Sequence, residues 1–128
     1  ISTNYNQLIF KLSNICLVIL YLYPGSILGF FFYNDFSDQP QITRDFFHIS
    51  SNHIYAFSLI SILGLFSFKS KKRLFIYLIC LSIVLEFFHL VIPNRSFQIG
   101  DLNGNLLGTV IPFLTYKVYE ILFRTKKK

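Results

Sequence analysis

Glu86 and His89 are two residues able to do chemistry that lie within one long apolar segment of the chain. Their spacing of three positions places both side chains on the same face of a helix. A carboxylate inside a membrane costs about 2.5 kcal/mol or more unless a polar partner or a proton neutralises it. The two residue types also suit general acid–base chemistry, in which either side chain accepts a proton. The pair therefore predicts either an ion pair that fixes helix packing or a binding site for a ligand.

Polar residues just after this segment offer the partners that Glu86 needs. The connection that follows is short, so the end of one helix lies beside the start of the next. We therefore expect one polar cluster whose members are Glu86, His89, Arg95, Asp101 and Asn105. In this hypothesis Glu86 and His89 hold Arg95, and its guanidinium contacts an anionic group. Asp101 and Asn105 then orient that group.

His53 lies near the start of an earlier apolar segment and has two interpretations. It is either an interfacial histidine hydrogen-bonded to a neighbour or a further member of the polar cluster. Ligation of haem by His53 and His89 is geometrically conceivable, but nothing else in the sequence supports it. Cys16 and Cys80 stand singly within apolar runs, as small packing residues do. Because no cysteine or histidine spacing indicates a metal site, the sequence predicts no metal and no cofactor.

Four apolar segments must position these residues. The chain of 128 residues is 53% hydrophobic and only 14% charged, whereas soluble domains carry about 25% charged residues. Each segment is close to the ~20 residues that a helix needs to cross the hydrocarbon core of a membrane. Alternation of apolar and polar residues is absent, so barrel strands are not expected. We predict one all-α transmembrane domain over 1–128, an integral membrane four-helix bundle with helices at roughly 8–33, 49–68, 74–92 and 105–123.

Local signals refine these helices. Pro24–Gly25 should kink or unwind the first helix, because proline has no N–H to donate. Asp101 or Asn103 would cap the start of the last helix by accepting from its free N–H groups. Gly104 and Gly108 form a small-xxx-small pair, which lets another helix approach closely and so predicts a helix-packing face.

Basic residues gather at one end of the predicted helices. Residues 69–73 hold four Lys or Arg residues and residues 124–128 hold four more, whereas the two opposite connections hold one each. By the positive-inside rule both termini are cytoplasmic, and the connections over 34–48 and 93–104 face outward. Charge that flanks apolar runs is typical of membrane topology, not of a nucleic-acid surface. The predicted partners are therefore membrane lipids, which the basic tail attracts when they are anionic, and not nucleic acid.

The segment from 86 to 108 resembles the signature of VanZ-like membrane proteins. That family shows a Glu, a Gln three residues later, a Pro-x-Arg motif, and then an Asp, an Asn and a Gly at fixed spacings. His89 stands where the family has Gln, and Ile49-Ser50 replace an Asp-Lys pair that often precedes the histidine matched here by His53. The resemblance covers the last three predicted helices, and the first contributes only length. The residues that match the signature are Glu86, Pro93, Arg95, Asp101, Asn105 and Gly108.

The resemblance implies a four-helix bundle in the bacterial plasma (inner) membrane, and it implies little about chemistry. Some members of the family are linked with lowered sensitivity to glycopeptide antibiotics such as teicoplanin. Drug resistance is not an expectation for this chain.

Three functions fit the sequence. The first is a non-enzymatic envelope protein whose outward-facing polar cluster binds a lipid headgroup or an envelope precursor. The second is a small accessory subunit of a larger membrane protein complex, which docks on partner membrane proteins through its glycine and phenylalanine faces. The third is an enzyme with Glu86 or His89 as general base, and it is the least favoured because no nucleophile lies at a suitable spacing.

Overall fold

The computed structural model of the protein describes residues 2–124, and within them all regular structure is helical. This confirms the all-α class for the described part of the chain. An isolated bridge between Phe46 and Ile49 is the one β-type pairing among these residues. The helices are α1 (Ser2–Leu22), α2 (Ile27–Tyr33), α3 (Ser51–Ser67), α4 (Lys71–Phe88) and α5 (Ile99–Arg124).

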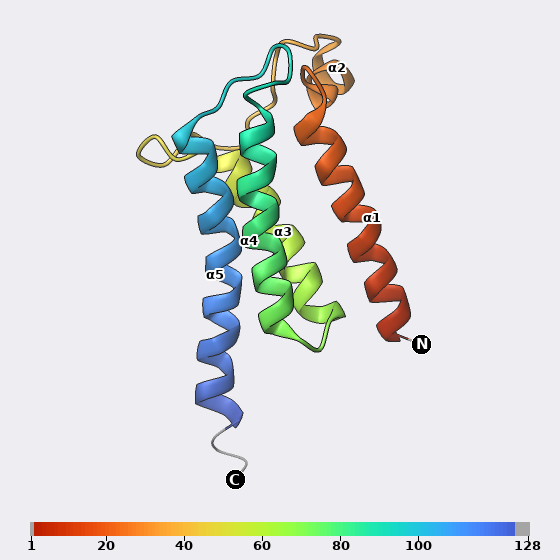
Figure 1. Ribbon diagram of the computed structural model, residues 1–128, viewed down its shortest axis with the longest axis vertical. Helices are drawn as coiled ribbons and strands as arrows, with labels where there is room; N and C mark the ends of the chain where they lie inside the picture. Colours follow the sequence, from red (N-terminus) through yellow and green to blue (C-terminus); the bar gives the residue numbers. More distant parts are fainter. Residues whose placement is uncertain (1, 125–128) are drawn as a thin grey trace.

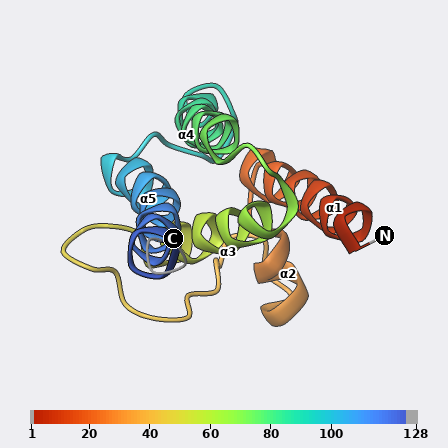
Figure 2. The same ribbon diagram turned by 90° about the horizontal axis from the view of Figure 1, so that it is seen from below.

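The long helices run between two ends of different chemistry (Figure 1). We call one the loop end: it comprises the α1–α2–α3 connections and short helix α2 (residues 23–50) and the α4–α5 connection (residues 89–98). We call the other the basic end, after the α3–α4 turn with Lys69 and the charged first turn of α4. The start of α1 and the end of α5 lie toward the basic end. Helix α3 contacts α1, α4 and α5, and the end-on view in Figure 2 shows it between α1 and α5.

The predicted helix over 8–33 is in fact two helices, because the chain turns at Pro24–Gly25. Gly25 has a φ of 146°, a conformation that L side chains rarely adopt. Ser26 then starts α2, and its side chain accepts a hydrogen bond of 2.8 Å from the N–H of Gly29. The predicted break therefore occurs, but the segment after it does not continue the direction of α1 (Figure 1).

The last helix begins earlier than predicted. It starts at Ile99, not near 105, and the carbonyl of Gln98 accepts the first helical bonds from the N–H groups of Asp101 and Leu102. Asp101 and Asn103 therefore lie inside α5, and the prediction that one of them caps it was wrong. An acidic side chain in the first turn still interacts favourably with the positive end of the helix dipole. The helix continues through Pro112.

Helices α3 and α5 pack backbone to backbone at two glycines. A Cβ atom added to Gly104 would lie 2.7 Å from the carbonyl oxygen of Ser50. At Gly108 the added atom would lie 2.5 Å from the carbonyl oxygen of Ile54. Both distances are shorter than van der Waals contact, so any larger residue would push the helices apart. This close approach brings the first turns of α3 and α5 together.

Two helices in the described residues are long and apolar enough to cross a membrane. They are α1, over Tyr5–Leu22, and α5, over Ile99–Arg124, and only 17% of each apolar window is buried. Helix α3 is apolar but has 17 residues, and α4 opens with three basic residues. Large side chains such as Phe66 (76% exposed) point away from the core. Length and composition thus support a membrane location through two helices, where the sequence predicted four.

Candidate functional site

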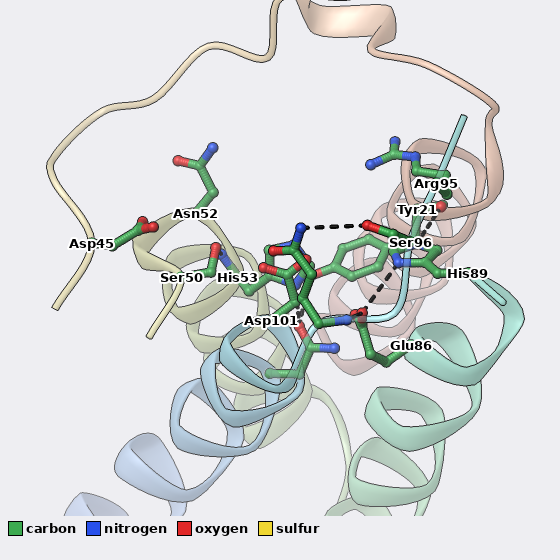
Figure 3. Close-up of polar contacts among 12 residues, drawn as sticks. Tyr21, Asp45, Ser50, Asn52, His53, Glu86, His89, Arg95, Ser96 and Asp101 are labelled. Carbon is green, nitrogen blue, oxygen red and sulfur yellow. Dashed lines mark hydrogen bonds and ion pairs between the residues drawn. The ribbon is translucent and has the colours of Figure 1, made fainter. Parts of the chain in front are cut away.

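A buried polar cluster lies where α1, α3, α4 and α5 meet beneath the loop end (Figure 3). Sequence analysis predicted most of its members, and the structure adds a tyrosine from α1. Each of the four helices supplies at least one side chain. We call it the polar cluster, and its members are Tyr21, His53, Glu86, His89, Asp101 and Asn105.

Asn105 is the centre of the hydrogen bonding and is fully buried. Its Oδ1 accepts from the Tyr21 hydroxyl at 2.8 Å and contacts Nδ1 of His53 at 2.7 Å. Its Nδ2 donates to the carbonyl oxygen of Ser82 at 3.2 Å. Because an amide oxygen can only accept, Nδ1 of His53 carries a hydrogen, and its Nε2 is left to meet another group. Asn105 thus joins all four long helices.

Glu86 is fully buried, and its two carboxylate oxygens differ in their hydrogen bonding. Oε1 accepts from the backbone N–H of Gln98 at 3.1 Å and lies 3.4 Å from Nδ1 of His89. Oε2 is buried and has no hydrogen-bond partner among the residues that the structure describes. The α4–α5 connection therefore does meet Glu86, but through the backbone of Gln98.

His89 is held on both sides of its ring. Its Nε2 lies 2.9 Å from the carbonyl oxygen of Tyr21, so this nitrogen is the donor. Its Nδ1 faces Glu86. The Tyr21 ring packs against both histidines, with centroids 4.8 Å from His53 and 6.1 Å from His89. An aromatic ring thus occupies the space between them, and the geometry does not support ligation of haem by the two histidines.

His53 and Asp101 face one another across the α3–α5 contact. Ser50 starts α3, its side chain accepts from the N–H of His53, and its own N–H donates to the carbonyl of Gly100 at 3.1 Å. These contacts place the first turns of the two helices side by side. The Nε2 of His53 lies 3.7 Å from Oδ2 of Asp101. His53 is therefore a member of the polar cluster, which was one of its two interpretations.

Arg95 does not take its predicted place in the polar cluster. Its Nε donates to the carbonyl of Tyr23 at 3.1 Å, and one Nη donates to the carbonyls of Leu20 (3.1 Å) and Gly25 (2.8 Å). No ion pair joins Arg95 to Glu86 in the described range 2–124. The last carbonyls of a helix lack partners and carry partial negative charge, so they attract a cation. Burial lowers the pKa of Arg95, yet a guanidinium keeps its charge in proteins.

Arg95 also lines an open cleft of about 410 Å³ at the loop end, which we call the Arg95 cleft. Among the residues that the structure describes, no carboxylate lines it. Ser37 is already engaged, since its hydroxyl (2.6 Å) and N–H (2.9 Å) both donate to Asp35 and hold the pKa of that carboxyl below its usual value. The lining residues are Pro24, Gly25, Ser26, Phe36, Ser37, Gln39, Asn94 and Arg95.

Tyr21 is the member of the polar cluster that the sequence did not predict. In the sequence it belongs to an apolar segment and looks like any interfacial aromatic residue. Its place just before Pro24–Gly25, where helix carbonyls lose their partners, is the signal that would have pointed to it. Ser82 and Gln98 contribute through backbone groups, which residue type does not reveal.

No family model matches the chain, and no curated protein or solved structure matches it. The resemblance of residues 86–108 to VanZ-like proteins therefore stays a prediction that depends on the motif residues themselves. The structure separates those residues into three roles. Glu86, Asp101 and Asn105 lie in the polar cluster, Arg95 binds the carbonyl of Leu20 at the end of α1, and Gly108 contacts α3.

Proposed function

We propose that this chain is a VanZ-like, multi-pass protein of the bacterial inner membrane that binds an anionic phosphate headgroup in the Arg95 cleft. The headgroup belongs to a membrane lipid or to a lipid-linked envelope precursor. The observation that carries the proposal is a charged guanidinium beside an open cleft that no described carboxylate lines.

The hydrogen bonds of Arg95 support this role. A guanidinium has five N–H groups, and the three bonds to the carbonyls of Leu20, Tyr23 and Gly25 use Nε and one Nη. The other Nη makes no hydrogen bond within residues 2–124, so its two N–H groups remain for a ligand. Because three bonds already hold the guanidinium plane, little freedom is lost when a phosphate binds. Gln39 and Asn94 add side-chain amides to the same cleft.

The arrangement of charge supports a four-span topology with the loop end outside. The first turn of α4 carries Lys71, Lys72 and Arg73 at the basic end, where α1 starts and α5 ends. The positive-inside rule then makes both termini cytoplasmic. Helices α3 and α4 have 17 and 18 residues, which gives about 26 Å at 1.5 Å per residue. A bilayer accommodates a shortfall of a few ångströms by local thinning.

The decisive test changes the charge of the cleft and leaves Arg95 in place, because loss of Arg95 would also leave the carbonyls of Leu20 and Gly25 without this donor. Gln39 lines the cleft and its side chain is exposed. Gln39→Glu should weaken binding of an anionic headgroup about fivefold, and Gln39→Lys should strengthen it by a similar factor, because one charge a few ångströms away contributes about 1 kcal/mol in water. Binding is measured by native mass spectrometry of the purified chain with added lipid.

The two sources of phosphate form separate arms of this experiment. One arm adds phosphatidylglycerol and the other adds a polyprenyl diphosphate, each with phosphatidylcholine as the neutral reference. The loss of the exposed outer arginine in Arg44→Ala is the matched control and should leave binding unchanged. Equal binding by both Gln39 variants would rule out the Arg95 cleft as the site. Stoichiometric co-purification of another membrane protein, with no bound lipid, would favour the accessory-subunit alternative.

A further inference from the structure

Three side chains that are far apart in the sequence meet within the polar cluster. His53 comes from α3, Glu86 from α4 and Asp101 from α5. Each offers one nitrogen or oxygen ligand atom, and these atoms all lie within 4.8 Å of one another. The sequence predicted no metal site, because no two of these residues are close enough in the chain to form a spacing motif.

The unpartnered oxygen of Glu86 is an independent sign that something binds there. The residue is fully buried, and its Oε2 has no partner among the described residues, while Oε1 accepts from Gln98. A buried carboxylate oxygen without a hydrogen bond is costly and rare in native proteins. A cation held between Glu86 and its two neighbours would satisfy that oxygen.

His53 is oriented as metal-binding histidines are. Its Nδ1 donates to Oδ1 of Asn105 at 2.7 Å, and Asn105 is itself held by Tyr21 and by the carbonyl of Ser82. This support turns the lone pair of Nε2 toward Asp101, 3.7 Å away. A fixed hydrogen bond on the far ring nitrogen is the usual outer-shell support of a histidine that ligates a metal.

Charge and ligand type indicate which ion fits. Two carboxylates close together in a buried place repel each other, and a divalent cation neutralises both. One imidazole nitrogen with two carboxylate oxygens suits a divalent transition metal such as Zn²⁺, since Ca²⁺ and Mg²⁺ prefer oxygen ligands alone. The side chains of His53 and Asp101 remain 16% and 20% exposed, so an ion can enter from the loop end.

We propose that His53, Glu86 and Asp101 bind one divalent transition-metal cation of the Zn²⁺ class. Three protein ligands leave a fourth tetrahedral position open for water or for a ligand. The site is separate from the Arg95 cleft: none of its three ligands lines that cleft. A failure to find headgroup binding would therefore leave the metal-site proposal untouched, and the reverse also holds.

The test is Zn²⁺ binding by the full chain, purified in detergent and stripped with a chelator. Isothermal titration should give one Zn²⁺ per chain, and Co²⁺ in its place should produce the visible absorption of a four-coordinate nitrogen and oxygen site. His53→Gln, Glu86→Gln and Asp101→Asn should each weaken Zn²⁺ binding by at least about tenfold, since even outer-shell changes cost that much. The Zn²⁺-dependent rise in melting temperature should disappear with them.

Matched controls separate this site from casual binding at the surface. His48→Gln and Asp38→Asn change exposed loop residues of the same types at the same end of the molecule, and both should bind Zn²⁺ like the unaltered chain. The proposal is overturned if a variant that combines His53→Gln, Glu86→Gln and Asp101→Asn binds as much Zn²⁺ as the unaltered chain. It is also overturned if His48→Gln weakens Zn²⁺ binding more than His53→Gln does. Should Glu86→Gln not fold, Asp101→Asn decides, because that side chain reaches the surface. Unchanged affinity in Asp101→Asn would overturn the assignment.

Discussion

At the scale of single residues, one oxygen organises the buried polar groups. Oδ1 of Asn105 accepts from Tyr21 and His53, which come from α1 and α3. Without this acceptor, two donors would be buried with no hydrogen-bond partner. Each such donor lowers the free energy of unfolding by about 1–3 kcal/mol. Losing the Tyr21 hydroxyl leaves the oxygen with its other donor, so the cost is lower, near 1 kcal/mol. If the acceptor is shared, the loss of Asn105 should therefore lower stability more than the loss of the Tyr21 hydroxyl.

Asn105→Leu should therefore destabilise the protein by about 2–4 kcal/mol, and Tyr21→Phe by about 1 kcal/mol. Unfolding in detergent by added denaturant, followed by circular dichroism, measures both values. In the double variant the Tyr21 substitution should cost almost nothing, because its acceptor is already gone. Tyr116→Phe is the control: that hydroxyl bonds Glu120 on the same helix and contributes little. Fully additive losses would contradict the shared-acceptor arrangement.

At the scale of helices, the contact between α3 and α5 positions the site. Gly104 and Gly108 let the α5 backbone lie against the carbonyls of Ser50 and Ile54. This contact brings His53 and Asp101 within 3.7 Å. Small residues at such contacts are how helices associate in a membrane, where lipid competes with every apolar side chain.

Gly108→Ala tests this contact, because close packing predicts that the substitution lowers stability, whereas an open helix predicts that it raises stability. In an open helix the change should stabilise by about 1 kcal/mol, because alanine has the better helix propensity. Here the new Cβ would lie 2.5 Å from the Ile54 carbonyl, so we expect a loss of about 1–3 kcal/mol from overpacking. Thermal unfolding in detergent measures the change. Leu114→Ala, at a position 61% exposed, is the control and should shift the melting temperature little. A more stable Gly108→Ala would mean that the helices do not touch there.

A second contact at the scale of helices is the one between Arg95 and the end of α1, and it can be tested by substitution. Arg95 satisfies three carbonyls around the turn at Pro24–Gly25. Arg95→Gln removes the charge and most of the donors, so we expect the end of α1 to loosen and to exchange its amide hydrogens faster. Hydrogen–deuterium exchange over residues 17–26 measures this, with Arg44→Gln in the α2–α3 connection as the control. Unchanged protection in Arg95→Gln would show that the arginine does not hold α1.

At the scale of the whole molecule, the two ends differ in charge and in chemistry. The loop end holds the polar cluster, the Arg95 cleft and the exposed Phe47, which is 95% exposed. The basic end holds Lys71, whose Nζ donates to the carbonyls of Leu65 (2.6 Å) and Phe68 at the end of α3. This polarity is what a membrane with a negative cytoplasmic surface would orient.

Cysteine labelling on intact cells checks the orientation. In a chain with Cys16 and Cys80 changed to serine, Phe47→Cys should react with a membrane-impermeant maleimide, because the proposed topology has the loop end outside. Lys69→Cys should react only after the cells are permeabilised. Prompt labelling of Lys69→Cys on intact cells, with Phe47→Cys protected, would reverse the proposed topology.

The sequence by itself determined the features that depend on near neighbours. The all-α class follows from long apolar runs, and the break before α2 follows from a proline that cannot donate. The convergence of Glu86, His89, Asp101 and Asn105 also follows from the short connection between two predicted helices. Helix boundaries were less certain, because the start of α5 depends on the carbonyl of Gln98 and not on a capping side chain.

The tertiary structure alone decided which groups meet. Arg95 binds carbonyls at the end of α1 and in the turn after it, although Glu86 is much nearer in the sequence. Backbone carbonyls attract a cation without leaving any signal in residue type. Tyr21 joins Asn105 across a separation of 84 residues, and His53 meets Glu86 and Asp101 from a third helix. Such contacts depend on how the helices pack. The spacing of residues in the sequence shows which side chains share a face of one helix, but it does not show which other helix packs against that face.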